Sequence, residues 1–368
     1  MQDFLELPNN PSLFALSCDV IKGKFEPVIK AEEAYQVSKT CENPFRKNIV
    51  TCKDIRLSVF VDEVQGLDLD TELQTVCQEL PFYIPVFDKN VKAIPNISKE
   101  FPFVALSLND ITSSGIIHKA GCLHEEKSVA LKGMMLQTPC FKNSKIILFS
   151  SGADNLIESV WYKRDDIKFF NRIAKMGFYA ATGFNFSLFV GECSFSHALN
   201  MKRSLASSSL YEQAGVLTIP HMYALNKFQV ARWCAWLKSN PSVSYFTVNC
   251  QIQRSKQEIA QVVQAIRSIL KSVPSVHVLV HGFPIDKIKA FENDILRVHF
   301  ADMLPLKKAF NYRRMVFDAQ NVKLRITHDD SVSIAELVAH NFSEKRMYID
   351  YVRKQMIVNY KLQAKSVA

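Results

Sequence analysis

The chain is poor in glycine and lacks the short motifs that bind nucleotide phosphates. Only 11 of its 368 residues are Gly, and neither a GxGxxG segment nor a GxxxxGK[ST] loop occurs. HExxH and GxSxG segments are also absent. These absences argue against a Rossmann dehydrogenase, a P-loop ATPase, a zinc peptidase of the HExxH type and an α/β-hydrolase.

Paired cysteines, a secretory signal and long apolar runs are missing as well. The nine cysteines are scattered without a CxxC pair, which is typical of reduced thiols in the cytoplasm. Cys122 and His124 lack the two further ligands that zinc needs, so no metal site and no cofactor are predicted. The first residues carry acid rather than base, and no apolar stretch approaches the roughly 20 residues of a membrane span. We therefore expect a cytoplasmic protein without a membrane partner.

The net charge of +9 permits attraction to phosphates or to acidic partners. Lysine and arginine are nevertheless spread along the chain without a basic block of five or six residues. Ordinary surface charge and a nucleic-acid footprint both fit this distribution.

Apolar runs of strand length alternate with helical segments from about residue 82 onward. Such runs are expected of parallel strands that are buried on both faces, and their alternation with helices is the βαβ pattern. The runs span 82–87, 101–108, 145–151, 177–183, 216–222, 243–249, 276–282 and 296–302. The predicted helices span 155–176, 195–214, 226–238, 255–272 and 284–293, and Ser255 and Glu258 form a capping box for the fourth. The sequence predicts an α/β fold, a TIM-like (β/α)8 barrel with an irregular first third.

Three regions are predicted along the chain. Residues 1–80 form an N-terminal extension with short strands and helices, including a strand at 54–64, and residues 81–310 form the barrel. Residues 311–368 form a C-terminal helical segment, with a helix or helix pair at 333–362 that either caps the barrel or meets a protein partner.

Functional groups of such barrels lie on the loops that follow the strands. Asp154 and Asp302 are candidates for a general base or nucleophile, with His221 or His281 as proton carrier. The predicted ligand-binding residues, which mix amides, hydroxyls and imidazoles, are Asn185, Ser187, His221, Tyr223, Asn249, Gln251 and His281. Asp110, Ser150, Ser151 and Gln253 also follow predicted strands. The alternative is that polar residues collect at strand ends because these ends meet water. His299 is interpreted as a core histidine, and Trp161, Trp233 and Trp236 as packing residues.

Residues 145–285 resemble an uncharacterised family, a domain of unknown function found in bacteriophages, plasmids and integrative elements. The resemblance is carried by 154–161 (DNLIESVW), 185–189 (NFSLF), Asn200, Arg203, 211–215 (YEQAG) before Ile219 and Pro220, and His281 with Gly282. The family's second block usually reads Pro-Asp-Phe-Ser-Leu-Tyr, where this chain has Gly183, Phe184 and Asn185. Its first block usually opens with paired acids, of which only Asp154 remains. An acid-dependent activity, if the family has one, would be lost here.

A more distant similarity is to the tRNA-guanine transglycosylase-like barrels. Residues 149–153 (FSSGA) look like their strand-end Asp-Ser-Gly motif, and 298–302 (VHFAD) like a late strand that ends in Asp. Ser150 stands where their acid would be, and their cysteine-rich zinc site is missing. The similarity implies a base-binding barrel rather than an active base-exchange enzyme.

Three hypotheses follow for the function. The preferred one is a phage or mobile-element barrel protein that binds a nucleotide or a nucleic-acid segment at the carboxyl ends of its strands. The second is a glycosyl-transferring or hydrolytic enzyme that acts on nucleobases or nucleic acid. The third is a non-catalytic scaffold that binds a protein partner through its C-terminal helix.

Overall fold

The computed structural model of the chain describes residues 63–74, 79–87, 101–109, 143–189, 194–253 and 255–367. The predicted strand 54–64, the pair Cys122 and His124, and Asp110 lie outside these residues, except for the last two positions of the strand. The helices that the structure describes include none that is both long enough and apolar enough to cross a membrane.

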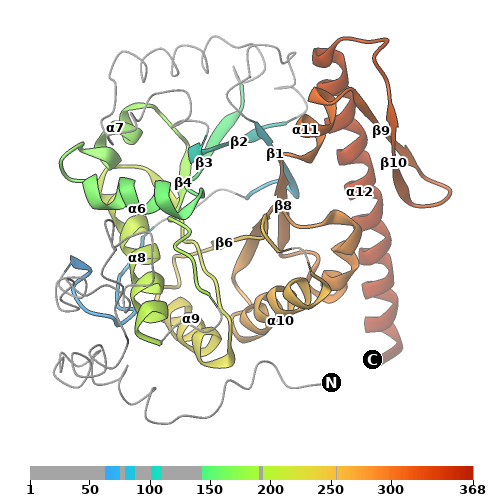
Figure 1. The fold of residues 1–368 in the computed structure, drawn as a ribbon. Coiled ribbons are helices and arrows are strands. Elements are labelled where there is room, and N and C mark those ends of the chain that lie inside the picture. Colours follow the sequence, from blue (N-terminus) through green and yellow to red (C-terminus); the bar gives the residue numbers. More distant parts are fainter. Residues whose placement is uncertain are drawn as a thin grey trace.

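Eight parallel strands form the centre of the molecule, and the predicted TIM-like barrel is confirmed (Figure 1). The sheet has the order β5-β4-β3-β2-β1-β8-β7-β6, so β1 and β8 pair and the sheet curls back toward its own start. The strands are β1 (Tyr83–Phe87), β2 (Phe103–Ser107), β3 (Lys145–Phe149), β4 (Ala180–Thr182), β5 (Leu217–Ile219), β6 (Tyr245–Asn249), β7 (His277–His281) and β8 (Val298–Asp302). Each predicted apolar run contains one of them.

The barrel is nearly closed between its two edge strands. One bridge joins the segment after β5 to β6, with His221 opposite Thr247. The amide of Met222 donates to the carbonyl of Thr247 at 2.9 Å, and the amide of Thr247 donates to the carbonyl of Pro220 at 2.9 Å. The carboxyl ends of all eight strands therefore face one end of the barrel, which we call the barrel mouth.

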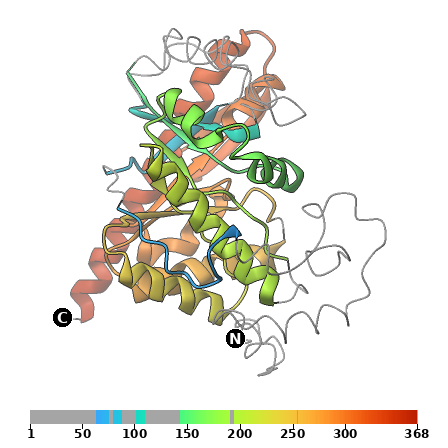
Figure 2. The same ribbon diagram turned by 90° about the vertical axis from the view of Figure 1, so that its left-hand side faces the viewer.

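Helices cover the outside of the barrel, as the two ribbon views show (Figures 1 and 2). They are α6 (Asp154–Lys163), α7 (Phe169–Lys175), α8 (Ser194–Gln213), α9 (Lys227–Ser239), α10 (Lys256–Ser272), the 3-10 helix η4 (Ile285–Asp294) and α11 (Leu304–Phe310). Both hydrogen bonds of the predicted capping box are present at the start of α10. The predicted packing role of the three tryptophans is also confirmed, since Trp161, Trp233 and Trp236 are each 1% exposed.

Two of the predicted helices differ from the structure. The helix expected over 155–176 is broken, because Lys168 has a φ of 50° in the left-handed region and begins a second helix, α7. The segment expected as an α-helix over 284–293 is the 3-10 helix η4, which follows Pro284. Helical periodicity reports which residues are buried, and it does not exclude a break or a tighter winding.

The C-terminal region contains a β-hairpin that the predicted helical segment does not include. Strands β9 (Arg313–Asp318) and β10 (Lys323–His328) pair antiparallel and are followed by the long helix α12 (Ile334–Val367). Helix α12 runs along the side of the barrel at the right of Figure 1. Its Phe342 ring lies 4.9 Å from that of Phe87, at the end of β1. The helix therefore packs on the barrel wall beside β1.

A candidate ligand site at the barrel mouth

Four of the predicted ligand-binding residues come together at the mouth: His221, Asn249, Gln251 and His281. Asn249 and His281 end β6 and β7 and are register partners. The backbone amide of Asn249 donates to Nε2 of His221, at a distance of 3.3 Å. Side chains at alternate positions of a strand share a face, and Leu279 belongs to the apolar cluster inside the barrel. His281, two residues on, points inward as well.

His281 lies at the centre of the group and is 1% exposed. Its ring stacks on that of Phe149 from β3, with centroids 4.4 Å apart. Its Nε2 lies 3.2 Å from the amide nitrogen of Gln251. An amide nitrogen only donates, so Nε2 accepts this hydrogen bond and the ring proton is on Nδ1.

Gly282 allows Gln251 to lie against His281. Its φ of +73° is in the left-handed region, and a Cβ built at this position would lie 2.5 Å from Cγ of Gln251. Any larger residue would both strain the backbone and push Gln251 away.

Three buried polar atoms around the mouth have no hydrogen-bond partner among the residues that the structure describes. They are Nδ1 of His281, Oγ of Ser151 after β3, and Oε1 of Gln253 after β6. The amide nitrogen of Gln253 is occupied, because it donates to the hydroxyl of Tyr223 at 3.1 Å. Buried polar groups are nearly always paired, so a donor, a hydroxyl and an acceptor without partners at or after the carboxyl ends of three barrel strands require an explanation.

Both histidines are neutral at ordinary pH. Burial lowers the pKa of His221 to about 3. Burial, with smaller contributions from His221 and Lys307, lowers the pKa of His281 to about 3. At neutral pH the two rings therefore act as uncharged hydrogen-bonding groups, which argues against the predicted role as proton carriers.

The structure places Asp302 away from the other predicted site residues. Ala301 belongs to the cluster inside the barrel, so its neighbour Asp302 points to the outer face of β8. There its Oδ2 lies 3.1 Å from Nζ of Lys345 on α12, and its Oδ1 accepts from the amide of Leu304. The sequence placed Asp302 at the end of a strand, but it did not show which face of the barrel the side chain occupies. Its carboxylate lies on the outer face, paired with Lys345, and does not contribute to the mouth.

Asp154, Asn185 and Ser187 join the loops after β3 and β4. Ser187 donates its hydroxyl to Asp154 at 2.5 Å, and the amide of Gly152 donates to Oδ1 of Asn185 at 3.1 Å. Asn200 donates to the carbonyl of Ser187 at 2.8 Å. These partners hold the two loops together, and Asp154 is exposed at the first residue of α6.

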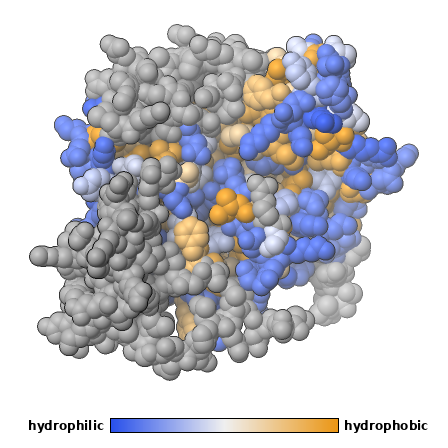
Figure 3. Space-filling view, viewed as in Figure 1, coloured by the Kyte–Doolittle hydropathy of each residue, from blue (hydrophilic) through white to orange (hydrophobic). Residues whose placement is uncertain are grey.

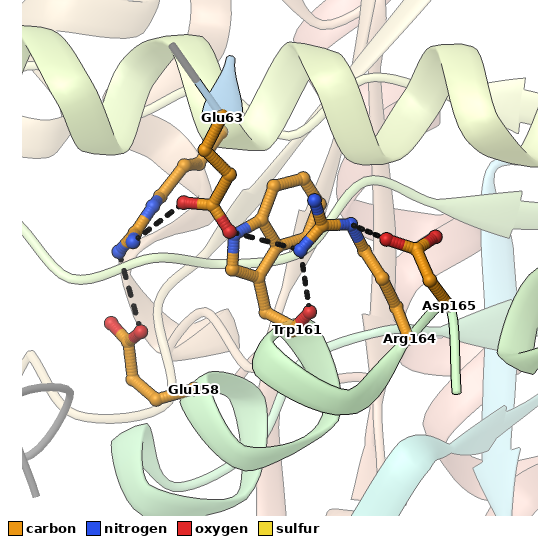
Figure 4. A network of polar contacts seen from close by, with 6 residues as sticks. Glu63, Glu158, Trp161, Arg164 and Asp165 are labelled. Carbon is orange, nitrogen blue, oxygen red and sulfur yellow. Dashed lines mark hydrogen bonds and ion pairs between the residues drawn. The ribbon is translucent and has the colours of Figure 1, made fainter. Parts of the chain in front are cut away.

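A buried charge network lies beside these loops (Figure 4). Arg203 on α8 is fully buried and contacts Glu63 at 3.1 Å and Glu158 at 3.3 Å. Arg164 reaches the other oxygen of Glu63 at 2.9 Å and stacks over the ring of Trp161. Burial raises the pKa of Glu158 to about 7, against the opposing effect of Arg203. This network attaches the segment 63–74 to the barrel, and the sequence prediction did not assign it a role.

No group of three or more metal-ligating side chains is placed to hold an ion in the described part of the chain. A scan against models of known protein families gave no match, and a search of curated proteins found no significantly similar sequence. The association with phages, plasmids or integrative elements therefore stays a prediction from the resemblance.

Proposed function

We propose that the barrel mouth binds a small planar ligand with the hydrogen-bonding pattern of a nucleobase, either free or as part of a nucleotide or nucleic-acid segment. The observation that carries the proposal is the set of unpaired buried atoms on Ser151, Gln253 and His281. A base edge presents donors and acceptors side by side, and it would satisfy a donor, an acceptor and a hydroxyl together.

The ligand reaches these atoms when the Gln251 side chain moves. Gln251 is half-buried and its amide covers Nε2 of His281. The ring of His281 stacks in turn on that of Phe149, which belongs to the apolar cluster inside the barrel. A ligand that displaces this amide takes over its hydrogen bond and gains those of the unpaired atoms.

Binding has more support than catalysis. The two histidines at the mouth have pKa values of about 3, and Asp302 is paired with Lys345 on the outer face. Asp154 is the remaining predicted acid, and it is hydrogen-bonded to Ser187. Among the described residues, the mouth therefore offers polar recognition without a charged acid or base beside His221 and His281.

The test uses a panel of nucleobases, nucleosides and mononucleotides with wild type and Ser151→Ala. Calorimetry should detect binding to wild type, and Ser151→Ala should raise the Kd of the best compound about fivefold, because one hydrogen bond contributes about 1 kcal/mol. Without ligand, the free energy of unfolding of this variant should be unchanged or higher, since an unpaired buried hydroxyl is removed.

Ser207→Ala is the matched control on α8. The Ser207 hydroxyl accepts from the amide of Phe184 at 2.8 Å and donates to the carbonyl of Ser204 at 2.7 Å. Its loss should lower the free energy of unfolding by about 1–3 kcal/mol and leave the Kd unchanged. The proposal fails if no compound binds wild type, or if Ser151→Ala loses stability as the control does and keeps its affinity.

A further inference from the structure

A groove of about 1130 Å³ lies on the outer surface of the barrel between α10 and η4, apart from the mouth. Basic side chains dominate its charged lining, and Asp286 and Asp294 are the acidic residues among the described ones. The basic residues are Lys256, Arg267, Lys271, Lys287, Lys289 and Arg297.

The two acids are already neutralised within the groove. Asp294 pairs with Arg267 at 3.5 Å and with Arg297 at 3.0 Å, and Asp286 pairs with Lys287 at 3.3 Å. Lys256, Lys271 and Lys289 are exposed and form no ion pair with any residue in the described ranges. Figure 3 shows hydrophilic residues gathered over α10 on the face in view. The groove therefore has an excess of positive charge that an acidic partner would neutralise.

The described lining residues of the groove include several apolar side chains and no aromatic ring. Ile259, Ala260 and Val263 of α10 and Ala290 of η4 are the apolar ones. Proteins that bind single-stranded nucleic acid stack its bases on aromatic side chains, and the part of the chain that the structure describes contributes none to this groove. An apolar strip with charged margins instead suits a helix that has one apolar and one charged face.

The spacing along α10 gives the length of the partner. Lys256 and Lys271 lie on the same stripe of the helix and mark its two ends. At about 1.5 Å per residue they are about 22 Å apart, the length of a helix of about 15 residues. We propose that this groove docks an acidic amphipathic helix of a partner protein, with apolar residues on Ala260 and Val263 and carboxylates on the unpaired lysines.

The test uses the full chain and a fluorescein-labelled peptide of about 18 residues, with leucine on one helical face and glutamate elsewhere. Fluorescence anisotropy should show binding at about 50 mM NaCl that weakens at about 300 mM. The triple variant K256E/K271E/K289E should raise the Kd at least tenfold. A triple variant with the same change in net charge, K238E/K323E/K354E, alters exposed lysines outside the groove and should have a much smaller effect.

Ala260→Arg separates the docking of a helix from general attraction of polyanions. It places a long charged side chain on the apolar part of the lining and adds positive charge, so it should weaken peptide binding and leave the binding of an oligothymidine of about 20 nucleotides unchanged or stronger. The proposal is overturned if both triple variants act alike, if Ala260→Arg binds the peptide as wild type does, or if only the oligonucleotide responds to the groove variants.

Discussion

Asp302 and Lys345 show how burial decides the role of a charged side chain. The side chains are 9% and 1% exposed, and they meet between β8 and α12. Removing two charges from water costs several kcal/mol, and their mutual attraction offsets this only while both are present. Asp302 therefore stabilises the contact between barrel and helix, and the pair explains why an acid at a strand end need not serve the mouth.

Replacing Lys345 with methionine should be strongly destabilising. The variant leaves a buried carboxylate without its counter-charge, so the free energy of unfolding should fall by about 3–5 kcal/mol in urea denaturation. Asp302→Asn in the same chain should restore most of the loss, because the amide oxygen still accepts from Leu304. Lys354→Met, an exposed position on the same helix, serves as control. A structural role for the pair would be contradicted if Lys345→Met were as stable as the control Lys354→Met.

Glu158 should make stability depend on pH. Its pKa is raised from 4.5 to about 7, so the folded chain holds a proton that the unfolded chain releases in this range. The contribution of this group to stability is then greatest below pH 4.5 and falls as the pH rises toward 7. Glu158→Gln cannot ionise, so relative to wild type its free energy of unfolding should rise across this window by about 2–3 kcal/mol. Urea unfolding of both proteins at several pH values measures the difference between their free energies of unfolding. If that difference did not change with pH, the pKa of Glu158 would not be raised.

At the scale of elements, side chains of α12 form hydrogen bonds with the backbone of β9 along the edge that does not pair with β10. Asn341 accepts from the amide of Met315 at 2.7 Å and donates to the carbonyl of Arg313 at 2.8 Å. His340 contacts the carbonyl of Met315 at 2.9 Å, and Glu344 accepts from the amide of Phe317 at 2.6 Å. The open edge of the strand is thereby satisfied, as exposed edges must be if they are not to pair with other chains.

Asn341→Ala should detach the hairpin from α12. Asn341 is fully buried, and its loss leaves backbone groups of β9 without partners. We expect the free energy of unfolding to fall by about 2–4 kcal/mol and the amide of Met315 to exchange its hydrogen faster. Gln320→Ala, in the exposed turn of the hairpin, should change neither quantity. Unaltered exchange at Met315 in the Asn341 variant would rule out this role.

Features that depend on residues close together in the sequence were predicted correctly. Ser255 and Glu258 lie three residues apart and form their capping box whatever surrounds them. His299 was interpreted as a core residue, and it is 4% exposed and hydrogen-bonded to His277 and to the carbonyl of Pro81. The hairpin was missed because β9 and β10 have exposed faces and weak apolar patterns, and contacts with α12 hold it in place.

At the scale of the whole molecule, closure of the barrel depends on few contacts. Neighbouring strands share several paired residues along most of the sheet, whereas His221 and Thr247 form the one bridge between the β5 and β6 edges among the described residues. His221 also accepts from the amide of Asn249. The same histidine thus contributes to closure and to the proposed site, so a change in ligand affinity at this position must be compared with a change in stability.

The sequence by itself determined the eight buried strands, the helices between them and the end of the barrel where polar residues gather. Those features follow from apolar periodicity and capping, which depend on residues close together in the chain. The tertiary structure alone decided that His281 meets Phe149 across the barrel and that Asp302 turns outward to Lys345. It also decided that Ser151, Gln253 and His281 keep atoms without a partner among the described residues. These outcomes depend on strand register and on the packing of distant segments, and no pattern within one segment encodes either of them.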